Sequence, residues 1–253
     1  MSSTSVVVDK VSKRFTSSNQ KTFKRLVINT VKRRPLSSSF TALDDISFTL
    51  DQGDTIGLMG LNGSGKSTLL KLISGVMMPD DGKVLTRGRI AGLIEVGAGL
   101  HPDLTGRENI YLNGAILGMS EPEINRKFDE IVDFSEMSKF LDKEVRHYSS
   151  GMFMRLAFST AVHTECDIFL IDEVLAVGDQ PFKKKCMKRI RELKGEGRTM
   201  VFVSHNPKQV VKLCERGIVL ESGRMVYEGS SEEAVKALGY VLDDADDDDD
   251  PAE

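Results

Sequence analysis

Apolar residues in this chain fall into short continuous runs that alternate with stretches of helical periodicity. Mostly apolar runs predict strands at 55–59, 168–171, 200–203, 218–220 and 225–227, after a strand-like opening at Val6–Val8. The last two runs flank Glu221-Ser-Gly-Arg224, which predicts a hairpin. Strands that alternate with helices are typical of an α/β core with a mainly parallel sheet, here joined by an antiparallel β portion.

The helical stretches gather in the middle of the chain. The motif Ser120-Glu-Pro-Glu123 has the form of a capping box, and apolar residues then recur at helical spacing to about Ser135. Phe153, Leu156, Ala157 and Ala161 mark a further helix. We therefore predict an inserted helical subdomain over about 96–163, within one domain that covers 1–240.

Size and composition exclude several classes of protein. With 253 residues, 40% hydrophobic and 28% charged, the chain has room for one large core. No apolar run approaches the roughly 18–20 residues of a membrane-spanning helix, and the opening MSSTSVVVDK lacks a signal-peptide pattern. Cys166, Cys186 and Cys214 lack CxxC spacing, which argues against a disulfide framework or zinc site and favours buried thiols in a reducing cytosol.

Charge is unevenly distributed along the chain. Eight of the last eleven residues are acidic, and removing them from the net charge of −4 leaves +4, so 241–253 is predicted to be an acidic disordered tail. In contrast, no acid lies between Lys10 and Asp44, and 16–40 forms a basic insertion. Apolar residues within 22–34 predict a basic amphipathic helix on a membrane surface or a partner. The alternative is a solvated insertion that packs its own apolar stripe.

A glycine-rich loop is the most specific motif of the sequence. Residues 60–68 read Gly-Leu-Asn-Gly-Ser-Gly-Lys-Ser-Thr, after a buried strand and before a helical run. The glycines let backbone N–H groups approach phosphate oxygens, Lys66 reaches the β- and γ-phosphates, and Ser67 offers a hydroxyl to Mg²⁺. We therefore predict a P-loop that binds ATP or GTP, with contacts from Gly60, Asn62, Gly63, Ser64, Gly65, Lys66, Ser67 and Thr68.

An acidic pair follows the apolar run at 168–171. Asp172 is expected at the carboxyl end of a parallel strand, where it would hold the Mg²⁺ shell, and Glu173 would polarise the attacking water as catalytic base. One strand later, His205 is placed to hydrogen-bond a γ-phosphate. Such an acidic pair is often only a helix cap and such a histidine is often structural, but the order of the motifs favours a catalytic set of Lys66, Glu173 and His205.

A second phosphate-handling motif reads Tyr148-Ser-Ser-Gly-Met152 and precedes a helical pattern. Ser149 and Gly151 would present a hydroxyl and bare N–H groups to a phosphate. A Ser-Ser-Gly before a helix is commonly only an N-cap. Its position between the P-loop and the acidic pair favours the phosphate-binding interpretation.

Together, these motifs resemble those of ATP-binding cassette (ABC) ATPases. Over about residues 5–240, the chain is similar to the nucleotide-binding subunits of bacterial ABC exporters of polysaccharides and teichoic acids. The stretches that carry this resemblance are Gly92–Asn109, Tyr148–Met152 and Asp172–Asp179, followed by Phe182 and Cys186.

The resemblance implies a head-to-tail dimer with two ATP molecules in its seam. Ser149 and Gly151 would then contact the ATP held by the other copy, and Asp179 would link the two sites. Phe15 would stack on adenine, and the segment Glu95–Arg107 would face polytopic membrane permease subunits.

The resemblance also implies a cellular location and a class of transported substrate. The protein would lie peripherally on the cytoplasmic face of the bacterial inner membrane. Through the permease it would export a polyprenyl-diphosphate-linked polysaccharide or teichoic acid. A carbohydrate-binding domain, which some relatives carry at their C-terminus, is not expected, so substrate choice would fall on the permease.

Two positions depart from the family pattern. The family's glutamine that contacts Mg²⁺ and water corresponds to Glu95, or to Val96 if the register differs by one residue, and a carboxylate there changes the charge beside the metal. The second motif lacks the usual leading leucine and second glycine, because Tyr148, Ser150 and Met152 replace the usual residues.

Two other functions remain open from the sequence. A soluble ABC ATPase that acts on nucleic acid or ribosomes usually has two cassettes or a long coiled-coil insertion, and neither occurs here. A P-loop module that binds without turnover would not need Asp172, Glu173 and His205. The exporter interpretation involves no nucleic acid.

Overall fold

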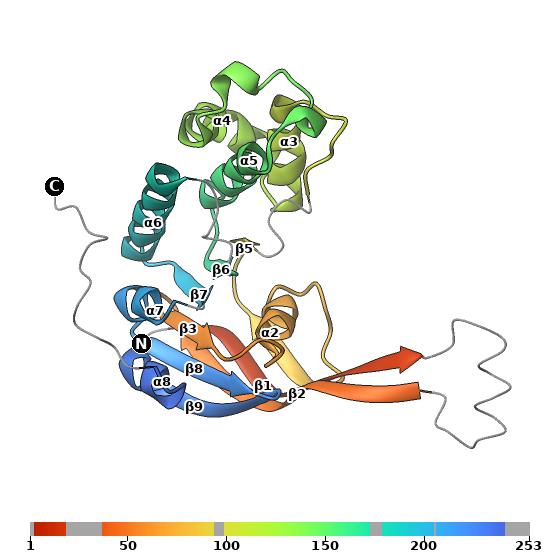
Figure 1. Ribbon diagram of the computed structural model, residues 1–253, viewed down its shortest axis with the longest axis vertical. Helices are drawn as coiled ribbons and strands as arrows, with labels where there is room; N and C mark the ends of the chain where they lie inside the picture. Colours follow the sequence, from red (N-terminus) through yellow and green to blue (C-terminus); the bar gives the residue numbers. More distant parts are fainter. Residues whose placement is uncertain (1–2, 19–36, 94–98, 173–178, 205, 241–253) are drawn as a thin grey trace, which may run out of the picture.

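The computed structural model describes residues 3–18, 37–93, 99–172, 179–204 and 206–240. Figure 1 shows a sheet-containing part, around β1, β2, β3, β8 and β9, and a group of helices that projects from the sheets. Within the described residues, no helix combines the length and the apolar character that crossing a membrane requires. Several predictions concern residues outside the described part: Glu95, Val96, Glu173, His205, the predicted basic helix at 22–34 and the predicted tail at 241–253.

The larger sheet has six strands in the order β5-β6-β7-β3-β8-β9. Its strands are β3 (Thr55–Met59), β5 (Ile90–Leu93), β6 (Ile168–Ile171), β7 (Thr199–Val203), β8 (Arg216–Glu221) and β9 (Arg224–Ser230). Neighbours pair in parallel except for β9, which forms an antiparallel hairpin with β8. β3, β6 and β7 are buried along their whole length, as continuous apolar runs require.

The smaller sheet is antiparallel, with the order β2-β1-β4. β1 (Thr4–Ser18) and β2 (Ser37–Asp51) form a long two-stranded ribbon, and β4 (Asp81–Thr86) pairs with the first part of β1. Figure 1 shows the distal part of this ribbon extending away from the rest of the protein. The strands therefore continue into both ends of the stretch that the sequence marked as a basic insertion.

Helices cover the sheets and form the projecting part. They are α2 (Lys66–Ile73), α3 (Gly106–Ile116), α4 (Glu121–Ser135), α5 (Ser150–Val162), α6 (Gln180–Gly195), α7 (Pro207–Leu213) and α8 (Ser231–Ala237), with 3₁₀ turns η1 (Ser138–Phe140) and η2 (Val145–His147). The helices α3, α4 and α5 lie between β5 and β6 in the chain and pack against one another. The predicted fold class is confirmed: a mainly parallel sheet, an antiparallel sheet and an inserted helical part.

Three apolar clusters hold these layers together. One packs β5, β6 and β7 against α5, α6 and α7, a second joins both sheets to α2, and a third lies among α3, α4 and α5. Cys186 and Cys214 are buried free thiols of the first cluster, and burial raises the pKa of each to about 12. All three cysteines are free, as the sequence predicts, but Cys166 is only partly buried.

The expected capping box at α4 is only half formed. The Ser120 hydroxyl accepts a hydrogen bond from the Glu123 backbone N–H, as predicted. The Glu123 carboxylate accepts mainly from the Arg89 guanidinium at 2.7 Å and from the Glu165 backbone N–H at 3.1 Å, and the Ser120 backbone N–H has only a minor effect on it. A complete capping box occurs instead at α3, between Thr105 and Glu108, where the sequence analysis did not identify one.

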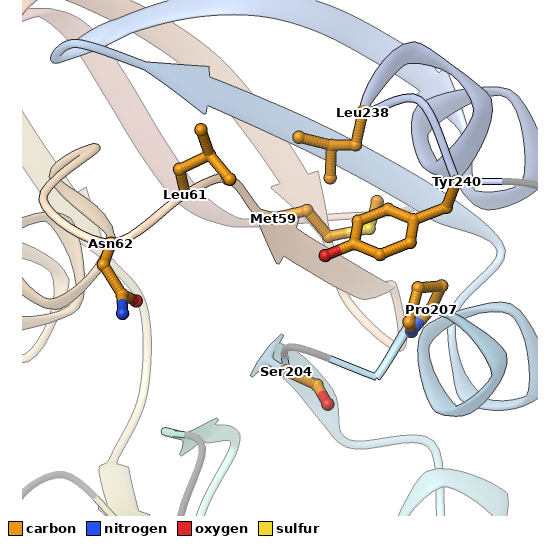
Figure 2. A pocket seen from close by; sticks show the side chains of 8 residues that line it. Met59, Leu61, Asn62, Ser204, Pro207, Leu238 and Tyr240 are labelled. Carbon is orange, nitrogen blue, oxygen red and sulfur yellow. The ribbon is translucent and has the colours of Figure 1, made fainter.

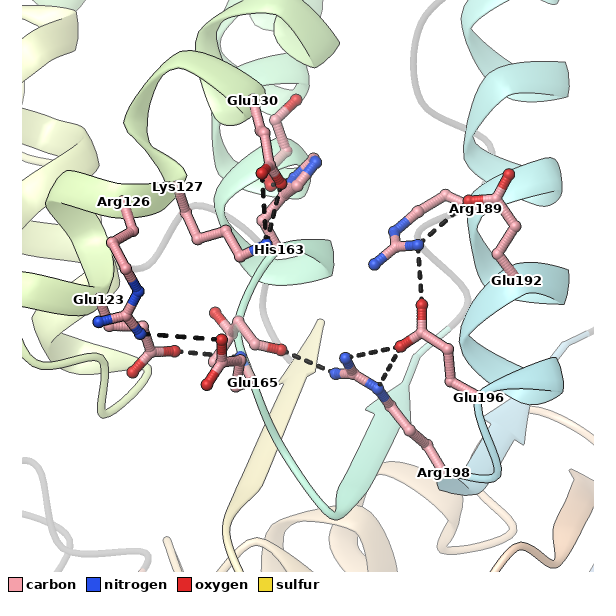
Figure 3. A network of polar contacts seen from close by, with 12 residues as sticks. Glu123, Arg126, Lys127, Glu130, His163, Glu165, Arg189, Glu192, Glu196 and Arg198 are labelled. Carbon is pink, nitrogen blue, oxygen red and sulfur yellow. Dashed lines mark hydrogen bonds and ion pairs between the residues drawn. The ribbon is translucent and has the colours of Figure 1, made fainter.

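Glu123 thus joins the helical part to the core. Figure 3 shows the polar contacts around it, in which Arg198 also reaches from the start of β7 to the Thr164 carbonyl beyond α5. Burial of the Glu123 carboxyl favours its neutral form, but the bonds from Arg89 and Glu165 outweigh burial and hold its pKa below the ordinary value. This contribution to stability is complete above the unfolded-state pKa and is lost as pH falls through the lower folded-state pKa.

We predict that Glu123→Gln lowers the free energy of unfolding at pH 7 by about 1–2 kcal/mol, because the Arg89 guanidinium loses its buried counter-charge. Urea denaturation measures this change. The matched control is Glu130→Gln on the same helix, whose exposed pair with Lys127 contributes about 0.5 kcal/mol or less. Equal losses in the two variants would contradict the role of Glu123.

Candidate nucleotide site

The glycine-rich loop connects the end of β3 to the start of α2, as the sequence predicts. Two glycines shape it, because Gly60 and Gly65 have φ values of 146° and 108°, which side chains rarely adopt. A Cβ on Gly65 would lie 2.7 Å from the Ala42 carbonyl oxygen, and one on Gly60 would meet the Leu220 carbonyl oxygen. The loop is therefore pressed against backbone from β2 on one side and from β8 on the other.

Lys66 lies folded over this loop. Its Nζ donates to the Gly60 carbonyl at 2.8 Å and to the Leu61 carbonyl at 3.0 Å. Burial lowers the pKa of Lys66 below its ordinary value, and the negative charge of Asp172 opposes that shift. Lys66 is thus a buried cation whose electrostatic partner, Asp172, directly follows β6.

The loop has the features of a phosphate cradle. The Ser64 hydroxyl is buried and has no hydrogen-bond partner within the described residues. A buried polar atom without a partner is costly unless a ligand or water satisfies it. Together with the close backbone packing and the Lys66 ammonium, this hydroxyl fits an anion such as a phosphate group.

Several predicted site residues meet at one edge of the sheet. β6, β7 and β3 are parallel neighbours, so their carboxyl ends bring together Asp172, Ser204 and the loop that begins at Gly60. Ser67 is exposed on the first turn of α2 and supplies a hydroxyl beside Lys66. A carboxylate and a hydroxyl are oxygen donors of the kind that Mg²⁺ prefers, so the donor set fits that metal.

A pocket of about 480 Å³ lies beside the loop (Figure 2). The residues around it come from the end of β3 and the loop that follows it, from the residue after β7, from the start of α7 and from the segment after α8. They are Met59, Gly60, Leu61, Asn62, Ser204, Pro207, Leu238 and Tyr240. Leu61 is 70% exposed, so this side of the loop is uncovered within the single chain.

The second motif lies at the start of α5, in the helical part of the protein. Ser149 is the N-cap residue, and its hydroxyl oxygen accepts from the Met152 backbone N–H at 3.2 Å. The N-cap alternative and the phosphate-binding interpretation are compatible, because an accepting hydroxyl keeps its own proton for donation. Because α5 packs on α3, α4 and β5 whereas α2 packs on β2 and β4, the two motifs belong to different parts of the chain.

Arg155 joins this motif to Asp179. The Arg155 guanidinium donates to the Asp179 carboxylate at 2.6 Å and to the Glu136 carboxylate at 2.5 Å, and it lies over the Phe182 ring at 4.6 Å. Asp179 is also the N-cap residue of α6. Arg155 could not be identified from the sequence, because it lies within the helix that begins with the second motif and belongs to no motif of its own.

Four other predicted site residues have described positions in the fold, and three lie outside the described residues. Phe15 lies on β1 and is 40% exposed. Gly151 is in the first turn of α5, and Asn62 and Gly63 are exposed in the loop. The roles assigned to Glu95, Glu173 and His205 stay predictions, because these residues lie outside the described part.

A family model described as ABC transporter matches residues 43–176. The O-antigen export system ATP-binding protein RfbB of Klebsiella pneumoniae is 48% identical over 203 residues, which cover 80% of this chain and 82% of that protein. The teichoic acids export ATP-binding protein TagH of Listeria monocytogenes is 44% identical over 198 residues, which cover 78% of this chain and 59% of that protein.

The fold has a match among solved structures. A dimeric, post-hydrolysis state of an ATP-binding cassette bound to ADP and Pi superposes with a TM-score of 0.71 at 23% identity, covering 89% of this chain and 98% of the other. This likeness concerns the fold, whereas the family model and the Klebsiella relative, at 48% identity, establish descent. The chain therefore belongs to the ABC transporter family.

Proposed function

We propose that this protein is the ATP-hydrolysing subunit of an exporter, and that it works as a head-to-tail dimer on the cytoplasmic face of a bacterial inner membrane. The observation that carries the proposal is the separation of the two phosphate motifs. The P-loop lies between β3 and α2 and the second motif begins α5, each present once in the chain. Two copies in opposite orientation supply both motifs to each of two ATP molecules.

The residues of one copy bind and orient the triphosphate. The P-loop N–H groups and Lys66 hold the phosphates, Ser64 offers its buried hydroxyl, and Ser67 and Asp172 would hold Mg²⁺. Bound there, Mg²⁺ would neutralise charge on the phosphate oxygens. Glu173 accepts the proton of the attacking water, and His205 positions the γ-phosphate.

The other copy closes the site. Ser149 and Gly151 of the partner subunit would reach the phosphates, and Asp179 would lie at the seam, held by Arg155. Closure moves the helical part, which faces the membrane permease through residues 95–107, and hydrolysis reopens the dimer. ATP drives this cycle only through its different affinities for the open and closed forms.

The names of the relatives support the proposed cargo. One is an O-antigen export protein and the other a teichoic acids export protein, and each aligns over more than three quarters of this chain. We propose that this protein powers export of a glycan or teichoic acid of that class, lipid-linked and delivered through the permease. Neither relative is named for action on nucleic acid or ribosomes, so that alternative gains no support.

We predict that Gly65→Ala weakens ATP binding about tenfold more than Gly63→Ala does. Both glycines have positive φ values, so alanine strains both backbones by about 1 kcal/mol. Only the Gly65 variant also drives a Cβ against the Ala42 carbonyl and Leu43, whereas a Cβ on Gly63 meets nothing within 4 Å. Calorimetric titration with ATP compares the two, and equal affinities would contradict the cradle described here.

We predict that Glu173→Gln reduces ATP turnover by about 10²–10⁴-fold, because the amide cannot accept the proton of the attacking water. The variant should still form dimers when ATP is added. Phosphate release and size-exclusion chromatography measure the two properties, with the exposed Glu121→Gln on α4 as control. Hydrolysis at the parent rate would refute the role of Glu173.

Co-purification tests the exporter itself. We expect the tagged chain, extracted from membranes in mild detergent, to bring down a polytopic membrane protein that mass spectrometry identifies. ATP turnover of the chain should change when that protein is present, since closure is coupled to it. Recovery only with ribosomes or in the soluble fraction would contradict the proposal.

A further inference from the structure

Two phenylalanines face each other across the β1–β2 ribbon. Phe15 and Phe40 are direct partners in the register of the antiparallel pair, so their side chains leave the same face of the ribbon. They are 40% and 62% exposed, and their neighbours Thr16, Ser39 and Thr41 are polar and exposed. The resemblance to ABC ATPases assigned Phe15 to adenine, whereas nothing has assigned a role to Phe40.

The pair lies next to the phosphate cradle. Ala42, whose carbonyl is pressed against Gly65, is only two residues from Phe40, which is about 7 Å along a strand. At this point the register shifts, because Lys13 pairs with Leu43 and Arg14 with Thr41, leaving Ala42 as an extra residue. Bulges of this kind bend a strand and redirect its side chains, often beside active sites.

Neither ring packs against another aromatic ring of the described residues. Within the described part of the chain, the contacts between aromatic rings gather around Phe134 and Tyr111 and do not include Phe15 or Phe40. Phe15 is anchored by the Lys13 ammonium, 6.0 Å from its ring centroid, which is itself bonded to Asp80 at 2.9 Å. Phe40 is the more exposed of the two, with more than half of its surface accessible to solvent.

We propose that Phe40 is a second base-contacting residue, which forms with Phe15 a two-ring platform for the adenine of ATP held in the P-loop of the same copy. A nucleobase is a flat π-system, and stacking on aromatic side chains is its usual mode of apolar recognition. The platform distinguishes nucleotides with a large base from the bare triphosphate. This inference rests on the proposed nucleotide site.

Titration with two probes, ATP and inorganic tripolyphosphate, tests the platform. Phe40→Ala should raise the Kd for ATP by about 5–30-fold, in the range of one lost stacking contact, and leave the Kd for tripolyphosphate unchanged. Phe40→Tyr should retain the affinity for ATP. The control is Ile116→Ala on α3, an exposed apolar residue of the helical part at 61% exposure, which should change neither Kd.

The outcomes separate this inference from the proposed function. An unchanged Kd for ATP in Phe40→Ala would overturn the platform alone and would leave the proposed function intact. The exposed face of the ribbon would then be a candidate contact surface for a protein partner. Equal weakening of both probes would also overturn it, because Phe40 would then act through the P-loop. A parent chain that binds neither probe would overturn the proposed function and this inference with it. Equal melting temperatures of the variants confirm that each is folded.

Discussion

Backbone packed directly on backbone is the constraint on which this site depends. The loop between β3 and α2 approaches a β2 carbonyl at Gly65 and a β8 carbonyl at Gly60, distances that leave no room for side chains. Because β2 belongs to the antiparallel sheet and β8 to the mainly parallel one, the phosphate cradle is fixed by both sheets at once. Any shift of one sheet against the other would distort the loop. One apolar cluster contains residues of both sheets and of α2, and its packing opposes such a shift.

The helical part is attached to this rigid base by a few charged contacts and by packing. Arg155 connects α5 with the start of α6, and Glu123 connects α4 with Arg89, next to β5. The third apolar cluster is confined to the helical part itself. Such an arrangement suits a part that moves as a unit while keeping its internal packing, as the proposed coupling to a membrane subunit requires.

Local patterns predicted local structure well in this chain. The strand bounds at 55–59 and 168–171 follow from continuous apolar runs, and the loop at 60–65 follows from its glycines. Features that depend on distant partners were not predictable. The main partner of the Glu123 carboxylate is Arg89, 34 residues away, and Phe40 lies opposite Phe15 only because of the register between β1 and β2. The catalytic roles of Glu173 and His205 remain inferences from motif order.

The two deeply buried thiols have a practical consequence. Burial raises the pKa of Cys186 and Cys214 to about 12, so both stay protonated thiols at pH 7 and react little with thiol reagents while the core is closed. Both sulfurs lie in the cluster that joins β6 and β7 to the helices. The labelling rate of these two thiols, resolved from that of the partly buried Cys166, therefore measures how often this core opens.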